Sequence, residues 1–219
     1  MKSRKALLKK SQLYLILNKQ NKPGKFLEKF CSKLTNSGID IVQLRDKLGA
    51  KQEILKLALK LSAFFTKSKT LFIVNDHVDI AFSSNADGVH LGQSDASVKI
   101  ARKILGKDKI IGISCHSLAQ VRKAEKDGAD YIGIGPIYAT PTKPEYKAIG
   151  LNILRRLKDK IKIPYFAIGD IRQGNLKGVV LSGAERIAVC RAILKSKNPK
   201  LSAMRLKSIL KKYDSIGIC

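Results

Sequence analysis

Residues 131–144, YIGIGPIYATPTKP, pass from a strand pattern to a turn-rich loop within a few positions. The run Tyr131–Ile134 is short and apolar, as in strands that are buried on both faces of a parallel sheet. The loop contains Pro136, Pro141 and Pro144, each of which removes a backbone donor and restricts the chain, so we expect a stiff, non-helical loop. A similar change from an apolar run to polar residues recurs along the chain.

Short apolar runs alternate with longer amphipathic stretches. The predicted strands are Leu13–Leu17, Asp40–Leu44, Leu71–Val74, Gly88–Leu91, Ile110–Ser114, Tyr131–Ile134, Tyr165–Ile168 and Arg186–Val189. The predicted helices are Gly24–Thr35, Ala50–Thr66, Val78–Ser84, Ser97–Leu105, Leu118–Asp127, Leu151–Asp159, Arg172–Leu181 and Pro199–Tyr213. Eight strands alternating with eight helices predict an α/β fold of one domain over residues 1–219, a (β/α)8 TIM barrel. A doubly wound sheet is the alternative, although it needs fewer strands.

The ends of the chain are basic. A basic N-terminal extension covers about residues 1–11, and we expect Lys2–Lys10 and the last few residues to be loosely ordered. No apolar run is long enough for a membrane span, and no signal peptide is recognisable, so we expect a cytoplasmic protein. The net charge of +26 is compatible with nucleic-acid binding, but the lysines are spread along the chain and aromatic residues are few, which disfavours that partner.

Cysteine and histidine spacings do not suggest a metal centre. Cys31, Cys115, Cys190 and Cys219 are far apart and form no CxxC pair, so reduced, buried thiols are the simplest interpretation.

Polar residues follow the predicted strands, where the functional face of a barrel lies. Gln43, Arg45 and Lys47 alternate along an extended segment and would project to one side as donors for an anion. A salt-bridged barrel end is the alternative interpretation.

Asp76 and Asp95 follow the third and fourth predicted strands. Each could cap the helix after it. Together with Arg45 and Lys47, they favour a Mg²⁺ site that also receives diphosphate oxygens, because Mg²⁺ typically takes one or two carboxylates and substrate phosphates.

The remaining strand ends add further polar groups. Ser114 and His116 follow the fifth strand, where Ser114 could bind a substrate ring or phosphate and His116 could carry a proton. Thr140, Thr142 and Lys143 form a donor-rich loop suited to phosphate, unless it is an ordinary surface loop. Gly169-Asp170 and Cys190-Arg191 follow the last two strands, where barrels often bind phosphate.

Five motifs together resemble the thiamine-phosphate synthase family, from about Leu13 to Leu194. They are Gln43-x-Arg45-x-Lys47, Asn75-Asp76, Gly88-Val-His-Leu-Gly-Gln93-x-Asp95, Gly112-x-Ser114-x-His116 and Gly135-Pro136-Ile-Tyr-x-Thr140-x-Thr142-Lys143. The resemblance implies a transferase that joins hydroxymethylpyrimidine diphosphate to a thiazole phosphate, releasing diphosphate and forming thiamine phosphate. A homo-oligomer is compatible with the sequence.

The resemblance also implies a role for each site residue. Gln43, Arg45, Lys47, Asn75 and Lys143 would hold the pyrimidine diphosphate, Asp76 and Asp95 would hold Mg²⁺, Ser114 would contact the pyrimidine, and Thr140 and Thr142 would contact the thiazole phosphate together with Gly169, Cys190 and Arg191. Arg45, Lys47, Lys143 and Ser114 would form the catalytic set.

Two positions depart from the family pattern, which usually has Gly-Gly after strand 7 and Ser after strand 8. This chain has Gly169-Asp170 and Arg191 there. Asp170 would repel a phosphate unless Arg191 pairs with it or binds the phosphate itself. Two alternatives to the synthase are a thiazole tautomerase-like isomerase of the same barrel fold and a non-catalytic barrel that binds a phosphate ligand.

Overall fold

The computed structural model describes residues 3–19, 24–141, 146–157 and 160–215. Its strands are β1 Leu13–Asn18, β2 Ile41–Arg45, β3 Leu71–Asn75, β4 Gly88–Leu91, β5 Ile110–Cys115, β6 Tyr131–Ile134, β7 Tyr165–Ile168 and β8 Ile187–Val189. Each strand pairs in parallel with the next, and β8 closes on β1 through the register Leu13↔Ile187, so the sheet is a complete barrel. The predicted α/β barrel is confirmed.

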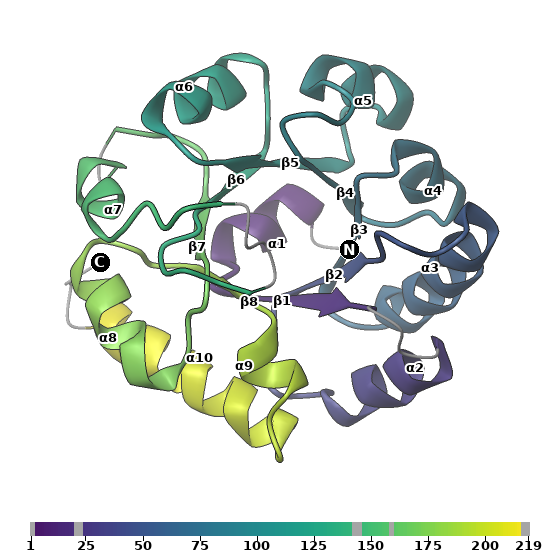
Figure 1. Ribbon diagram of the computed structural model, residues 1–219. Coiled ribbons are helices and arrows are strands. Elements are labelled where there is room, and N and C mark those ends of the chain that lie inside the picture. Colours follow the sequence, from purple (N-terminus) through teal and green to yellow (C-terminus); the bar gives the residue numbers. More distant parts are fainter. Residues whose placement is uncertain (1–2, 20–23, 142–145, 158–159, 216–219) are drawn as a thin grey trace.

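Most helices surround the barrel, and the first of the chain lies across one end of it (Figure 1). They are α1 Arg4–Lys10, α2 Gly24–Lys33, α3 Lys51–Thr66, α4 Val78–Ser83, α5 Val98–Leu105, α6 Leu118–Lys126, α7 Asn152–Leu157, α8 Gln173–Leu181, α9 Arg191–Leu194 and α10 Pro199–Ser215. All eight predicted helices are present, although the last two residues of the predicted stretch Leu151–Asp159 lie outside the described ranges. Helices α1 and α9 were not expected from the sequence pattern.

Two apolar clusters hold the fold together. The larger one fills the space between the strands and the surrounding helices, and includes Val42, Leu61 and Val179. The smaller one fills the barrel itself, where the ring of Tyr14 packs edge-on against Phe166 with centroids 5.3 Å apart. Because inward and outward side chains alternate along each strand, β1 and β2 contribute to both clusters.

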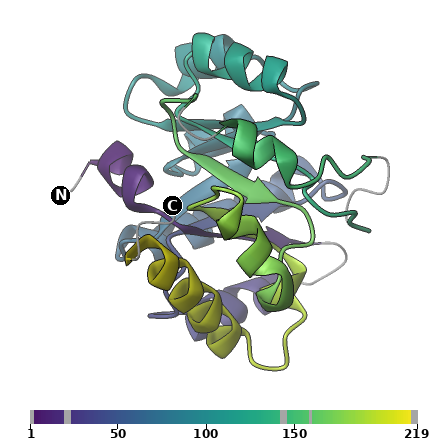
Figure 2. The same cartoon turned by 90° about the vertical axis from the view of Figure 1, so that its left-hand side faces the viewer.

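Helix α1 corrects one expectation: the basic segment Lys2–Lys10 is not loosely ordered over its described part. Arg4–Lys10 is helical, capped by the side chain of Ser3, and Leu8 is only 2% exposed because it packs into the barrel cluster. Arg4 and Lys5 pair with Asp87 at 2.7 Å and Asp130 at 3.0 Å. The helix therefore covers the end of the barrel where the strands begin, which we call the lower end (Figure 2).

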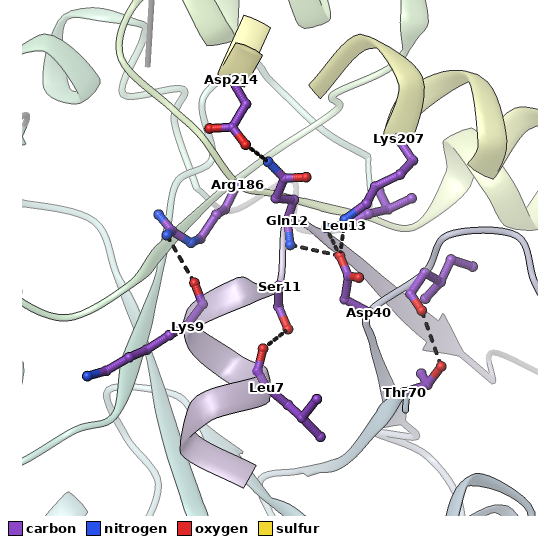
Figure 3. Close-up of polar contacts among 11 residues, drawn as sticks. Leu7, Lys9, Ser11, Gln12, Leu13, Asp40, Thr70, Arg186, Lys207 and Asp214 are labelled. Atoms are coloured by element: carbon purple, nitrogen blue, oxygen red, sulfur yellow. Dashed lines mark hydrogen bonds and ion pairs between the residues drawn. The ribbon is translucent and has the colours of Figure 1, made fainter. Parts of the chain in front are cut away.

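A repeated aspartate stabilises this lower end. Asp40, Asp87 and Asp130 each directly precede an even-numbered strand and each accept a backbone N–H from the start of the preceding strand, at Leu13, Phe72 and Ile111 respectively, over 2.8–2.9 Å. Each carboxylate also has a cationic partner. For Asp40 this is Lys207 of α10 at 2.6 Å, and Figure 3 shows how it reaches the start of β1 beside the end of α1. These aspartates link the strands to α1, α5 and α10, which favours a structural role for this end.

In the part of the chain that the structure describes, no helix combines the length and apolarity that a membrane span requires.

Candidate active site

The opposite, upper end of the barrel carries two adjoining cavities. The polar cavity is lined by Arg45, Lys47, Asn75, Asp76, Gly92, Gln93, Ser94, Asp95, Ser114, His116 and Tyr146. The apolar cavity is lined mainly by Ile16, Gly133, Pro136, Thr140, Ile168, Gly169, Ile171, Val189, Cys190 and Arg191, together with Arg45, Ser114 and His116. Because Arg45, Ser114 and His116 line both cavities, they form a shared wall between them.

Two carboxylates face each other in the polar cavity. Asp76 and Asp95 are close enough to share a hydrogen bond, and Lys47 pairs with Asp76 at 2.5 Å. The sequence prediction that Asp76, Asp95 and Lys47 meet at one site agrees with this geometry. The alternative of a salt-bridged barrel end also describes a real contact, the pair between Lys47 and Asp76.

Neither aspartate caps a helix. The N-cap of α4 is His77, and that of α5 is Ser97, whose hydroxyl accepts from the N–H of Ile100. Asp95 instead accepts from the backbone N–H of Gly92 at 2.6 Å. The capping alternative is therefore wrong for both residues, and their carboxylates remain directed at the polar cavity.

Asp76 is held in an unfavourable state. Its φ of 64° lies in the left-handed region, which costs free energy for a residue with a side chain. Burial raises the pKa of Asp76, and the neighbouring Asp95 raises it further, although Lys47 opposes both effects. Burial acts in the same direction on the pKa of Asp95, but the hydrogen bonds from Asp76 and from the Gly92 amide outweigh it and leave that pKa lowered. A cation between the two carboxylates would relieve this tension.

A hard divalent cation fits this donor set. Among the described residues, no three side chains of His, Cys, Asp or Glu come together as a complete metal site. A pair of carboxylates is nevertheless what Mg²⁺ typically uses when substrate phosphates supply its other oxygens. The pair of Asp76 and Asp95 therefore fits Mg²⁺ bound with a phosphorylated substrate.

Arg45 and Gln43 point into the barrel, but at different depths. Arg45 is half-buried, lines both cavities and donates to Asn18 Oδ1 at 3.2 Å. Gln43 is only 2% exposed, and its amide nitrogen donates to the hydroxyl of Tyr14 at 2.9 Å. Gln43 therefore shares the side of β2 that alternation predicted, but it lies below the cavities and lines neither of them.

Two arginines bond to Asp170 in the lining of the apolar cavity. Asp170 accepts from Arg191 and, at 3.1 Å, from Arg172. Asp170 also has a positive φ of 44°, next to Gly169 with a φ of 115°. Two guanidinium charges and one carboxylate leave a net charge of +1 beside the cavity, so the expected repulsion of a phosphate by Asp170 is offset. The pairing of Arg191 with Asp170, anticipated from the sequence, is present.

Gly169 is required by close backbone contact. A Cβ at this position would lie 2.5 Å from the nitrogen of Ile137. The other expected phosphate ligands divide into two groups: Thr140 lines the apolar cavity, whereas Thr142 and Lys143 lie outside the described residues.

The imidazole of His116 is held in place by two contacts. Its Nδ1 forms a hydrogen bond with the carbonyl of Gly135 at 2.5 Å, and its ring stacks on that of Tyr146 with centroids 4.4 Å apart.

Sequence reasoning missed four polar residues beneath the cavities. Tyr14, Tyr131 and His90 lie inside the barrel, and Asn18 supports Arg45 from the end of β1. The first three lie within apolar strands, and the sequence of such a strand does not show which of its side chains point into the barrel. Asn18 gave a usable signal, since it is a polar residue directly after a predicted strand, as Asn75 is.

Comparisons with known proteins agree with this geometry. A family model described as thiamine monophosphate synthase matches residues 13–193. The chain belongs to the thiamine monophosphate synthase family. A thiamine-phosphate synthase of Shouchella clausii is 38% identical over 200 residues, which cover 91% of this chain and 96% of that protein. One from Halalkalibacterium halodurans is 40% identical, with 91% and 95% covered.

A solved structure supports the same assignment. The thiamine phosphate pyrophosphorylase of Pyrococcus furiosus superposes with a TM-score of 0.85 at 31% identity, covering 95% of this chain and 98% of that one. Some members of the thiamine monophosphate synthase family are longer: the match to the Gloeobacter violaceus synthase spans 48% of that protein. The transferase prediction is confirmed by these relatives.

Proposed function

We propose that this chain forms thiamine phosphate at the shared wall between its two cavities, from hydroxymethylpyrimidine diphosphate and a thiazole phosphate. The observation that carries the proposal is the overlap of the cavities at Arg45, Ser114 and His116. A polar cavity suited to diphosphate and an apolar one lined in part by Arg45 and Arg191 would hold the two substrates with their reacting atoms at the junction. Such positioning alone supplies a large part of the rate of a two-substrate reaction.

The polar cavity would bind the diphosphate. Arg45 and Lys47 place positive charge on its walls, and Asn75 lines it too and is only 8% exposed. Asp76 and Asp95 would hold Mg²⁺, which when bound supplies charge neutralisation for the departing diphosphate. Lys47 would then exchange its contact with Asp76 for the diphosphate oxygens. Lys143, which lies outside the described residues, is a further proposed ligand on the basis of the family resemblance.

Two bond changes complete the transfer. The bond between the pyrimidine methylene carbon and the diphosphate oxygen breaks, and its electron pair leaves with the diphosphate. The lone pair of the thiazole nitrogen forms the new carbon–nitrogen bond. Neither change requires a nucleophile from the protein. The side chains would act by orienting both rings, and Arg45 and Lys47 would stabilise the negative charge that develops on the departing diphosphate.

The apolar cavity would bind the thiazole phosphate. Its lining residues Ile16, Ile168 and Val189 suit an uncharged ring, and Thr140, Gly169 and Arg191 also line it. Arg191 takes the place of the Ser that is usual in the family, so in this chain an arginine side chain would add to the backbone contacts with the phosphate.

Small phosphorylated molecules are therefore the proposed partners, and nucleic acid is not among them. The cytoplasmic location and a homo-oligomeric state stay predictions from the sequence.

A direct assay tests the function. Purified protein, both substrates and Mg²⁺ should give diphosphate and thiamine phosphate, and Asp95→Ala should abolish the product. If no product forms with both substrates and Mg²⁺ present, the result would support a non-catalytic binding barrel. Isomerisation of a thiazole that persists in Asp95→Ala would support the tautomerase alternative instead.

A further inference from the structure

A chain of four hydrogen bonds runs through the middle of the barrel to the shared wall. It joins Gln43 Nε2 to the Tyr14 hydroxyl at 2.9 Å, Tyr14 to the Tyr131 hydroxyl at 2.8 Å, Tyr131 to His90 Nδ1 at 2.9 Å, and His90 Nε2 to Ser114 Oγ at 3.0 Å. The first four residues are at most 9% exposed, whereas Ser114 is half-buried and lines both cavities. Buried polar groups in such a series constrain one another's protons.

Gln43 determines which group donates and which accepts in each hydrogen bond of the series. Its amide nitrogen can only donate, so the Tyr14 oxygen accepts that bond. Within the described residues, the other hydrogen-bond partner of the Tyr14 hydroxyl is Tyr131. Tyr14 therefore gives its single proton to Tyr131, because any other arrangement would leave a buried donor without an acceptor.

The same argument continues through His90. Tyr131 accepts from Tyr14 and has one proton left to donate, which goes to His90 Nδ1. With Nδ1 accepting, His90 is neutral and carries its proton on Nε2, where it donates to Ser114 Oγ. Burial raises the pKa of both tyrosines, so both keep the protons that this series requires.

We propose that this series is a positioning device that sets the polarity of Ser114. Ser114 accepts from His90 and so directs its own proton into the cavities as a donor. An acceptor atom of a ligand that faces Ser114 can then receive this proton, which suits an unprotonated ring nitrogen of the pyrimidine better than its amino group, because the amino group could reach only the second lone pair of Oγ. The choice of ligand atom rests on the proposed function, whereas the polarity of the series rests on the hydrogen bonds alone.

Two glycines make room for the series. A Cβ on Gly112 would lie 2.1 Å from Cζ of Tyr131, so only glycine allows the Tyr131 ring to occupy its place. A Cβ on Gly133 would lie 3.4 Å from Cε1 of His90, which leaves little space beside that ring. The glycine of the Gly112-x-Ser114-x-His116 motif is thereby explained by packing of the tyrosine that orders Ser114.

The tautomer of His90 tests the proposal without any substrate. The ring nitrogens of ¹⁵N-labelled protein are observed by NMR well above the ordinary histidine pKa of about 6.5, so that histidines are neutral. Variants His77→Asn and His116→Asn assign the signals. His90 should carry its proton on Nε2, whereas His116 should carry it on Nδ1, since that atom faces the carbonyl of Gly135. A proton on Nδ1 of His90 would reverse the series and overturn the proposal.

Two matched variants then test the effect on the ligand. Tyr131→Phe removes the donor to His90, whereas Tyr165→Phe removes a tyrosine hydroxyl that bonds the carbonyl of Gly183, away from the series. Tyr131→Phe should mix the two His90 tautomers and raise KM for the pyrimidine diphosphate about tenfold, with KM for the thiazole phosphate unchanged. Tyr165→Phe should change neither.

The outcomes separate this inference from the proposed function. An unmixed His90 tautomer in Tyr131→Phe, or equal effects of the two variants, would contradict the positioning role. A protein that lacks transferase activity but shows the expected tautomers would contradict only the proposed function.

Discussion

The aspartates at the two ends of the barrel differ in their hydrogen-bond and ion-pair partners. At the lower end, Asp40, Asp87 and Asp130 each accept a backbone N–H and pair with a cation from another element. At the upper end, Asp76 and Asp95 face each other. The lower carboxylates lie among donors and cations, whereas Asp76 and Asp95, although they contact Lys47 and the Gly92 amide, also lie against each other.

This difference separates stability from function. A satisfied carboxylate contributes to the folded state, whereas a strained one at φ 64° beside a like charge can only persist if the surrounding fold holds it there. Binding of the proposed cation and phosphate at the upper end would therefore be favourable. Substitutions at the two ends should accordingly affect different measurements.

The largest effect is expected from Asp76→Asn. Loss of this proposed Mg²⁺ ligand should lower kcat/KM by about 10²–10³-fold. Because the pKa of Asp76 is raised, its ionised form costs stability near neutral pH, so removal of that charge should leave the Tm without Mg²⁺ unchanged or higher. Calorimetry and steady-state assays measure both quantities. A lower Tm with full activity would place Asp76 among the structural aspartates.

Asp130→Asn should have the reverse profile. Asp130 accepts from Ile111 and pairs with Arg102 at 2.5 Å and Lys5 at 3.0 Å, and its side chain is only 11% exposed. The asparagine amide would bring a donor against the Arg102 guanidinium, so unfolding in urea should show a loss of about 3 kcal/mol. The activity of the folded fraction should match that of the unmodified protein. A selective loss of activity would contradict the division between the ends.

Arg191→Ala should affect only one substrate. Without its charged hydrogen bond, KM for the thiazole phosphate should rise about 10–30-fold, while KM for the pyrimidine diphosphate stays the same. Arg172→Ala is the matched control, because Arg172 also bonds Asp170 but its side chain is 65% exposed. Equal effects of the two variants would show that Asp170, and not Arg191, determines affinity.

The smallest effect is expected from Lys5→Ala. Lys5 pairs with Asp130, but its side chain is 48% exposed, and such pairs contribute less than about 1 kcal/mol. Urea unfolding should therefore barely change, in contrast to Asp130→Asn. A loss as large as that of Asp130→Asn would mean that α1 is held mainly by this contact and not by burial of Leu8.

The architecture could be predicted because parallel strands buried on both faces have a plain signature. Runs such as Tyr131–Ile134 and Gly88–Leu91 begin and end in the structure where the sequence placed them. The upper-end residues Arg45, Asp76 and Asp95 could also be predicted, since each lies at the end of a strand or in the short segment after it.

The features that the sequence did not predict depend on the depth of side chains in the barrel and on contacts between residues that are distant in sequence. Charge alone suggested disorder for Lys2–Lys10, but Leu8 and the distant Asp87 and Asp130 hold Arg4–Lys10 as a helix. Gln43 was expected at the cavity, yet it lies deeper, because its partner is Tyr14 of the neighbouring strand. No local pattern reveals such a cross-strand hydrogen bond.

The common wall of Arg45, Ser114 and His116 has a practical consequence for inhibitor design. Fragments that occupy the two compartments separately would lie end to end, so a short tether could join them without crossing bulk solvent. A joined molecule should bind far more tightly than either half, because the second half is delivered at a high effective concentration.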